Sequence, residues 1–201
     1  MIIVIEGGDQ AGKLTQSTML EKVLRKRKIK TQLFHFPDYT TPVGKEIRAY
    51  LDGKRKFSPQ VIHCLLSANR WEKLEQIKKA QEKNSVLIMN RYYQSNLIYG
   101  KANGIKEKWL ENLDSGLPKA DLVILLDITQ KESFTRIPRN EKGDAMKRDK
   151  FEKNQAFIQK ISKIYLTVAK KKKWKVIDAS KSKEEVHDEI LKTFSKKIGI
   201  R

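Results

Sequence analysis

Residues 2–15 read IIVIEGGDQAGKLT, a short apolar run that leads directly into a glycine-rich loop. The loop has the spacing G-x-x-x-x-G-K, and it consists of Gly7, Gly8, Asp9, Gln10, Ala11, Gly12, Lys13, Leu14 and Thr15. A strand before such a loop and a helix after it make backbone N–H groups converge at the positive end of the helix, where phosphate oxygens bind. Lys13 adds a point charge for the outer phosphates. The alternative is an ordinary strand-to-helix turn that contains a lysine, and the flanking strand and helix favour a phosphate-binding loop.

Four short runs of β-branched and apolar residues alternate with amphipathic segments along the chain. Continuous apolar strands separated by helices are typical of a parallel sheet covered on both faces. We therefore predict an α/β fold of the P-loop NTPase type, with a five-stranded parallel sheet flanked by helices, in one domain over residues 1–201. The expected strands are 2–5, 86–89, 122–126, 174–177 and the more polar 31–36, and the expected helices are 13–28, 58–82, 150–172 and 182–197, with shorter ones near 43–52, 93–101 and 106–113. Residues 129–149 lack clear periodicity and are predicted to form a long loop.

The composition excludes several classes of protein. The chain has 201 residues, of which 39% are hydrophobic, so it can bury a full core and is not of the disordered class. No apolar run approaches the roughly 20 residues of a membrane-spanning helix, and the first ten residues lack the pattern of a secretory signal. The lone cysteine, Cys64, excludes an internal disulfide and is expected to be a small buried residue. We expect a soluble protein of the cytoplasm, with no membrane partner.

The net charge of +19 raises the question of nucleic-acid binding, because Lys and Arg release counterions from phosphate backbones. The densest basic runs, at 25–28 and 170–173, fall at the ends of predicted helices, where they complement the helix dipole. No aromatic residues alternate with them as stacking platforms would. We therefore favour a solvated basic surface over a nucleic-acid interface, and note that a positive field also suits small polyanions.

Ligands of open α/β sheets bind at the carboxyl ends of the strands, and two arginines belong to elements that reach this edge. Arg91 follows the strand at 86–89, and Arg70 lies on the helix after the second loop. Two guanidiniums beside a phosphate loop suit a second phosphate group, which they would hold bidentately. A surface salt bridge is the alternative for each arginine alone.

Seven stretches along the chain form a more specific pattern: Glu6-Gly7-Gly8-Asp9, Ala11-Gly12-Lys13, Phe36-Pro37-Asp38, Ser67-Ala68-Asn69-Arg70-Trp71-Glu72, Arg91-Tyr92, Gly116-Leu117-Pro118-Lys119-Ala120-Asp121-Leu122 and Asp178-Ala179-Ser180-Lys181-Ser182. In this order they resemble the thymidylate kinase family, in its archaeal and eukaryotic branch. The resemblance covers nearly the whole chain. It implies transfer of the γ-phosphoryl group of ATP to thymidine monophosphate (dTMP), with Mg²⁺, by a homodimer.

The resemblance also implies roles for individual residues. Lys13 and the loop amides would hold the ATP phosphates, and the basic loop at 129–149 would be a lid over ATP. The implied acceptor-binding residues are Asp9, Phe36, Pro37, Asp38, Leu66, Arg70, Arg91, Ser95, Asn96 and Tyr99. Among them, Asp9 would meet the 3′-hydroxyl, Arg70 the base, Arg91 the acceptor phosphate, Tyr99 the underside of the sugar, and Ser95 with Asn96 the thymine edge. Gln10 replaces a loop arginine of one branch, so the transition-state cation would come from the lid, where Arg136, Arg139, Arg148 and Lys150 are available.

Four positions depart from the family pattern, and all lie in the implied site. Leu14 replaces the Ser or Thr that ligates Mg²⁺, and Thr15 cannot simply substitute because one step along a helix turns the side chain by about 100°. Asn90 replaces a carboxylate, so Asn90 and Thr15 stay as the candidate metal ligands. Tyr39 replaces a phosphate-binding arginine, and Leu66 replaces a phenylalanine that stacks on thymine. The alternatives are thus a kinase for another pyrimidine nucleotide, or a nucleotide-binding protein with little turnover.

Overall fold

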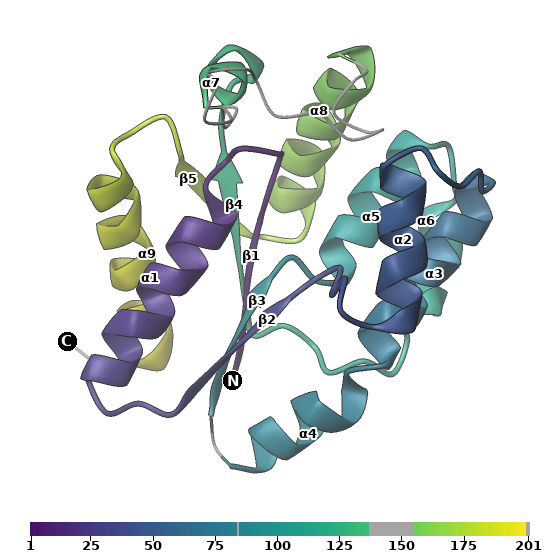
Figure 1. The fold of residues 1–201 in the computed structure, drawn as a ribbon. Helices are drawn as coiled ribbons and strands as arrows, with labels where there is room; N and C mark the ends of the chain where they lie inside the picture. Colours follow the sequence, from purple (N-terminus) through teal and green to yellow (C-terminus); the bar gives the residue numbers. More distant parts are fainter. Residues whose placement is uncertain (84, 137–154, 200–201) are drawn as a thin grey trace, which may run out of the picture.

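A computed structural model describes residues 1–83, 85–136 and 155–199 of the chain. Its centre is a five-stranded parallel sheet with the strand order β2-β3-β1-β4-β5, flanked by helices (Figure 1). The predicted parallel sheet is therefore confirmed. The elements are β1 (Ile2–Gly7), α1 (Lys13–Lys26), β2 (Thr31–His35), α2 (Pro42–Leu51), α3 (Pro59–Trp71), α4 (Leu74–Glu82), β3 (Val86–Asn90), α5 (Tyr93–Ala102), α6 (Glu107–Leu113), β4 (Leu122–Asp127), α7 (Gln130–Thr135), α8 (Gln155–Lys171), β5 (Lys175–Asp178) and α9 (Lys183–Ile198).

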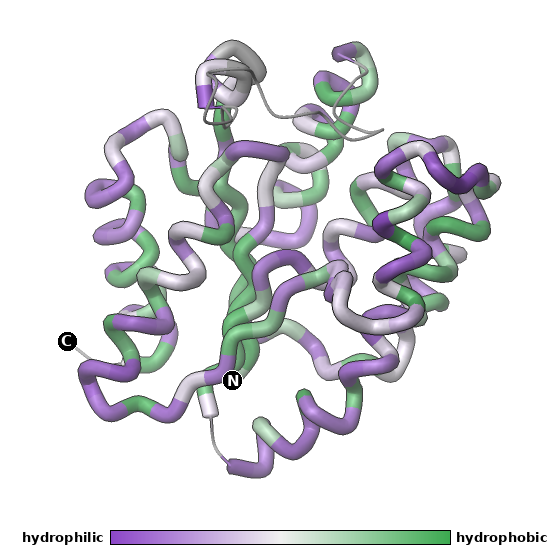
Figure 2. Tube along the Cα trace, in the orientation of Figure 1, coloured by the Kyte–Doolittle hydropathy of each residue, from purple (hydrophilic) through white to green (hydrophobic). Residues whose placement is uncertain are grey.

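The central strand β1 is buried on both faces, and its side chains alternate between two cores. Ile3 and Ile5 pack with residues of α1 and α9 on one face of the sheet. Ile2 and Val4 point to the other face, which α4 covers, while α5, α6 and α8 pack around a third core next to it. The hydropathy colouring shows this apolar centre as green strands surrounded by mixed helices (Figure 2). Burial on both faces explains why the strands read as uninterrupted apolar runs.

Helices α2 and α3 form a separate outer unit beside the sheet. They pack on each other through a small core of Ile47, Tyr50, Leu51 and Ile62. Ser58 and Thr41 cap the two helices, since each side-chain oxygen accepts a hydrogen bond from a first-turn backbone N–H. Helix α3 also packs against α5, which joins this unit to the rest of the fold.

Three expectations from the sequence were wrong in detail. The single helix predicted at 58–82 is two helices, because α3 packs against α2 and α5 whereas α4 covers the sheet. The predicted loop at 129–149 begins with α7, whose capping box joins Thr129 and Glu132. The rest of that loop, from residue 137, lies outside the described residues. Cys64 is exposed rather than buried, because it lies on the outer side of α3.

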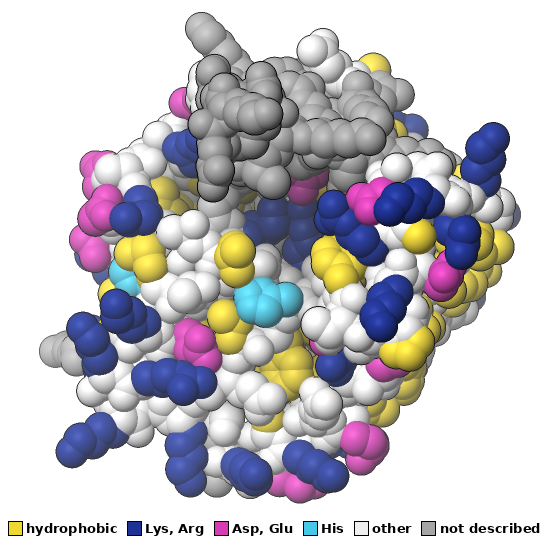
Figure 3. Space-filling view, viewed as in Figure 1, with side chains coloured by type: hydrophobic (Ala, Val, Ile, Leu, Met, Phe, Trp, Pro, Cys, Tyr) yellow, Lys and Arg dark blue, Asp and Glu magenta, His cyan; other side chains and the backbone are white. Residues whose placement is uncertain are grey.

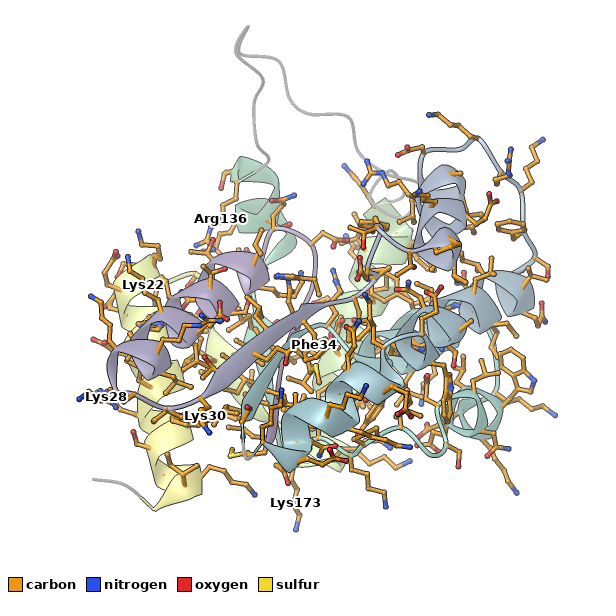
Figure 4. All side chains as sticks on the ribbon, turned by 60° about the horizontal axis from the view of Figure 1, so that its bottom comes forward. Lys22, Lys28, Lys30, Phe34, Arg136 and Lys173 are labelled. Atoms are coloured by element: carbon orange, nitrogen blue, oxygen red, sulfur yellow. The ribbon has the colours of Figure 1, made fainter. Side chains whose placement is uncertain are left out.

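The basic runs lie where the sequence predicted, at the ends of α1 and α8. Lys28 and Lys173 follow these helices in the left-handed backbone conformation, and their side chains extend away from the body of the molecule (Figure 4). This arrangement places positive charge at the carboxyl ends of helices, where the helix dipole is negative. Among the described residues, no helix is both long and apolar enough to cross a bilayer.

Gly44 fixes how closely α2 approaches the loop after β2. A Cβ atom at this position would lie 1.8 Å from the backbone oxygen of Asp38 and 2.9 Å from the Cα atom of Tyr39. Both contacts are with backbone atoms, so no side-chain rotation could relieve them. The close approach holds the loop that carries Phe36 and Pro37 against α2.

We expect Gly44→Ala to destabilise the protein by about 1–3 kcal/mol through overpacking. The direction of the change in stability is informative, because a Gly→Ala change at an open helix position increases stability by about 0.5–1 kcal/mol. Urea denaturation of the variant and of Lys45→Ala, an exposed site on the same helix, measures the effect. Unchanged stability of Gly44→Ala would show that the loop moves freely and does not depend on this contact.

Candidate functional site

The glycine-rich loop connects β1 to α1 at the carboxyl edge of the sheet. Gly7 and Gly12 have φ angles of 151° and 83°, and a Cβ at Gly7 would lie 2.6 Å from the backbone oxygen of Leu126. Helix α1 starts at Lys13 with no side-chain cap and no acidic residue in its first turn. Its first N–H groups are therefore available to an anion. Lys13 is largely buried, and its Nζ donates to the backbone oxygen of Gly8, so the ammonium stays over the loop.

Beside this loop lies a pocket between the sheet edge and the α2–α3 unit. The space-filling view shows Lys and Arg side chains gathered in the recess at this place (Figure 3). The pocket brings together all of the predicted acceptor residues except Asp38. Its lining consists of Asp9, Phe36, Pro37, Tyr39, Ile47, Leu51, Ile62, Leu66, Arg70, Arg91, Tyr92, Ser95, Asn96 and Tyr99.

Asp38 lies outside the pocket lining, where it orders the loop after β2. Its carboxylate forms an ion pair with Lys73 at 2.7 Å and accepts hydrogen bonds from the backbone and hydroxyl of Thr40. Burial alone would raise the pKa of Asp38, but these hydrogen bonds and the Lys73 charge lower it to about 2. The structure thus places Asp38 in a loop-ordering role, whereas the resemblance implied contact with the acceptor.

Asp9 and Arg91 form an ion pair where the phosphate loop meets the pocket. The Asp9 carboxylate also accepts a hydrogen bond from the Tyr99 hydroxyl at 3.2 Å, and the Arg91 guanidinium lies 5.5 Å from the centre of the Tyr99 ring. Burial alone would raise the pKa of Asp9, but the charges of Arg91 and Lys13 outweigh it and the pKa is lowered. A fixed carboxylate and a fixed guanidinium therefore stand side by side at the junction.

Glu6 holds this junction in place, a role that the sequence did not predict. The fully buried carboxylate accepts hydrogen bonds from the backbone N–H groups of Tyr92 and Ser95, both at 3.1 Å. It accepts two more from the hydroxyls of Ser95 and Tyr165, each at 2.8 Å. Burial and the nearby Glu6 charge raise the pKa of Tyr165, so its hydroxyl remains a donor. The sequence did contain a signal for this role, because Glu6 is a charged residue near the end of the otherwise apolar strand β1.

Arg70 also lines the pocket, as half of a buried ion pair. Its Nε and one terminal nitrogen donate to the two oxygens of Asp114, at 3.0 and 2.8 Å. The two side chains are only 3% and 5% exposed. Asp114 also accepts a hydrogen bond from Ser67 at 2.8 Å. A bidentate pair fixes the plane of the guanidinium and leaves its remaining N–H groups as donors.

Asn96 lines the same pocket from α5. Its amide oxygen accepts a 2.6 Å hydrogen bond from Nδ1 of His63, and its amide nitrogen lies 3.4 Å from an oxygen of Asp114. Burial lowers the pKa of His63, which keeps the imidazole neutral. The other ring nitrogen then accepts from the amide of Asn103, at 3.2 Å. Both the oxygen and the nitrogen of the Asn96 amide therefore have hydrogen-bond partners.

A second hollow lies on the other side of the phosphate loop. Arg136 reaches it from the end of α7 and donates to the backbone oxygen of Ser180, at 3.4 Å. Its lining consists of Gln10, Ala11, Gly12, Thr15, Gln16, Arg136, Ala179, Lys181, Ser182, Lys183 and Val186. The loop therefore has one concave site on each side, and both contain basic side chains. Arg139, Arg148 and Lys150, the other predicted lid cations, lie outside the described residues.

The candidate magnesium ligands are neutral oxygens. Leu14 is 59% exposed and offers no ligand atom, whereas the neighbouring Thr15 presents a hydroxyl at the surface. The amide nitrogen of Asn90 lies 3.2 Å from Nδ1 of His35, so its amide oxygen is turned away from that ring. No cluster of three or more His, Cys, Asp or Glu side chains suited to a metal occurs within residues 1–83, 85–136 and 155–199.

Comparison with known proteins gives a consistent result. The sequence model of the thymidylate kinase family matches residues 5–190. The chain is 35% identical to the thymidylate kinase of Schizosaccharomyces pombe over 195 residues, which cover 96% of this chain and 91% of that protein. It is 34% identical to the human thymidylate kinase, over 94% of this chain and 87% of the human protein. The solved structure of the thymidylate kinase of Candida albicans superposes with a TM-score of 0.83 at 29% identity, covering 97% and 91% of the two chains.

We expect Glu6→Gln to destabilise the protein by about 1–3 kcal/mol, because the amide nitrogen would face groups that are themselves donors. Ser95→Ala is the matched control, since it removes one hydroxyl donor and leaves the carboxylate in place. Chemical denaturation measures the free energy of unfolding of both variants, and we expect the larger decrease for Glu6→Gln. Equal or smaller loss for Glu6→Gln would mean that the carboxylate charge is not needed at this junction.

Proposed function

The chain belongs to the thymidylate kinase family, and on that premise we propose how its residues phosphorylate dTMP to thymidine diphosphate with ATP as donor. The observation that carries the proposal is the place of Asp9, which belongs to the phosphate loop and also lines the acceptor pocket. Donor and acceptor sites therefore share a wall. In-line phosphoryl transfer needs this adjacency and no covalent intermediate on the protein.

On the donor side, the loop amides and Lys13 would bind the ATP phosphates at the amino end of α1. The second hollow, with Arg136 and the lysines at 181 and 183, would receive the rest of ATP. We propose that residues 1–201 act as one kinase domain in which 129–149 closes over ATP as a lid. Closure would exclude water, the competing phosphoryl acceptor. Arg136 and Arg139 are then the candidate cations for the transition state.

On the acceptor side, the polarity of the pocket fits a nucleoside monophosphate lying with its phosphate toward the loop. Arg91 would bind the acceptor phosphate, and Asp9 would accept a hydrogen bond from the 3′-hydroxyl. The Tyr99 ring lies beside both groups, where it would disfavour a 2′-hydroxyl. Arg70 would donate to the base, which would pack against Phe36 and Leu66 in the pocket lining. These roles follow from the family and are supported by the arrangement of charges.

Magnesium would bind with ATP, with the hydroxyl of Thr15 and the amide oxygen of Asn90 as the nearest oxygens of this chain. Two neutral oxygens fit Mg²⁺ when most of its ligands are phosphate oxygens and water. The ion supplies charge neutralisation at the transferred phosphoryl group. The protein contributes little negative charge to hold the metal, so we propose that Leu14 and Asn90 lower the turnover number.

The test of the function is ADP release from Mg-ATP with a panel of nucleoside monophosphates. We expect a clear preference for dTMP, and about a 10-fold rise in kcat when Leu14→Ser and Asn90→Asp are combined, because a hydroxyl and a carboxylate return to the metal. Leu14→Val is the matched control and should change nothing. Preference for another pyrimidine nucleotide would overturn the choice of acceptor. No turnover with any acceptor, even in the double variant, would favour a nucleotide-binding role.

We also propose that the chain forms a homodimer through the outer side of α3. Val61 is 45% and Trp71 37% exposed, and Cys64 lies exposed between them at helical spacing. Light scattering should give twice the 23.4 kDa of one chain, and Val61→Arg should give the monomer. Leu166→Arg, which alters an equally exposed leucine on α8, should remain dimeric. A dimer broken only by Leu166→Arg would place the interface elsewhere.

A further inference from the structure

Within the described part of the chain, one polar group in the wall of the acceptor pocket lacks a hydrogen-bond partner. Tyr92 is fully buried and lines the pocket, and its hydroxyl makes no hydrogen bond within the described part of the chain. A buried hydroxyl left unpaired costs about 1–3 kcal/mol. Such groups are rare in native proteins, and each calls for a physical reason.

The polar neighbours of this hydroxyl are already committed to one another. Arg70 donates hydrogen bonds to both oxygens of Asp114, and Asp114 also accepts a hydrogen bond from the Ser67 hydroxyl. Asn96 is held by His63 through its amide oxygen. Burial raises the pKa of Tyr92, while the nearby charge of Arg70 lowers it and that of Asp114 raises it. The hydroxyl is therefore neutral and lies near Arg70 in the pocket wall.

Tyr92 and its neighbour Arg91 both line the pocket but contact different groups. The Arg91 guanidinium reaches Asp9 and the phosphate loop. The Tyr92 ring instead packs on Phe36, with ring centres 5.6 Å apart. A ligand that spans the pocket with its phosphate at Arg91 would thus meet Tyr92 with the part farthest from the phosphate.

The chemistry of a pyrimidine nucleotide identifies that part. In the pyrimidine ring, C4 lies opposite N1, the atom that carries the sugar. The substituent on C4 is consequently the one that reaches this wall. Arg70 can only donate hydrogen bonds, whereas a carbonyl oxygen has two lone pairs and accepts from two donors. A 4-carbonyl oxygen can accept from Arg70 and from the Tyr92 hydroxyl at once.

We propose that the Tyr92 hydroxyl is a base-reading group that donates to the 4-carbonyl oxygen of the acceptor nucleotide, beside Arg70. This assignment rests on the proposed function, because it takes dTMP as the acceptor. It also explains why a buried hydroxyl persists without an internal partner, since the ligand supplies the partner. A 4-amino base, which presents N–H groups to the same wall, would face the donors of Arg70.

The test compares two adjacent tyrosines by calorimetric binding of dTMP without ATP. Tyr92→Phe should raise the Kd for dTMP about 3- to 10-fold, the effect of one neutral buried hydrogen bond. In steady-state assays, KM should rise while kcat stays unchanged. The melting temperature of the ligand-free variant should stay equal or increase, because an unpaired buried hydroxyl is removed.

Tyr93→Phe is the matched control, because the Tyr93 hydroxyl accepts a 3.3 Å hydrogen bond from the backbone of Ala120 and lies outside this pocket. It should lower the melting temperature and leave the Kd for dTMP unchanged. A second probe is the deoxynucleotide of 5-methyl-2-pyrimidinone, which lacks the 4-oxygen. Against this probe, wild type and Tyr92→Phe should bind equally.

Three results would overturn the assignment. These are an unchanged Kd for dTMP in Tyr92→Phe, an equal penalty against the probe without the 4-oxygen, or a ligand-free melting temperature below that of wild type. The last would mean that the hydroxyl has an internal partner. Failure of the proposed function looks different, because the wild-type protein itself would then not bind dTMP.

Discussion

The arrangement of the site depends on one buried carboxylate. Glu6 lies one residue before the end of the central strand, next to the phosphate loop, and its four hydrogen bonds reach the start of α5 and the middle of α8. A carboxylate without solvent is costly unless every lone pair is used, so the surrounding donors must keep their positions. Those donors include the backbone N–H of Tyr92, which directly follows Arg91. The position of Arg91, which we propose binds the acceptor phosphate, is thus fixed by the same interaction that holds the end of β1.

The second buried charge pair acts in a different way. Arg70 and Asp114 are almost completely removed from water, and pairs of this kind contribute little net stability, since desolvation cancels the Coulomb attraction. Their value here lies in geometry. The bidentate contact fixes the direction of the free N–H groups of Arg70, and Ser67 and Asn96 fix Asp114 in turn. Recognition at this end of the pocket is therefore prepared before a ligand arrives.

The sequence was sufficient for the sheet and the phosphate loop, because these depend on local patterns, whereas most of the pocket lining was implied by the family resemblance. Apolar runs of strand length mark β1, β3 and β4, and the glycine spacing marks the loop. The roles of Glu6 and Asp114 depend on partners as far as 159 and 44 residues away in the chain, so no local pattern reveals them. The Tyr92 hydroxyl is distinguished only by lacking a partner in the described part of the fold, which the sequence does not show. Cys64 shows the opposite error, in which an apolar helix face was taken as core although it is exposed. The Thr129–Glu132 capping box was a local signal that could have been found.

The position of β1 also has a consequence for how the chain is made. The central strand β1 is synthesised before both of its partners, which lie far behind it in the chain, with Ile2 opposite Leu87 and Ile3 opposite Leu122. Until those segments are synthesised, an uninterrupted apolar strand has no edge to pair with. Folding of the core is therefore delayed until most of the chain is available, and during this interval nascent chains can associate through the same strand. The high positive charge opposes that association, because it keeps unfinished chains apart.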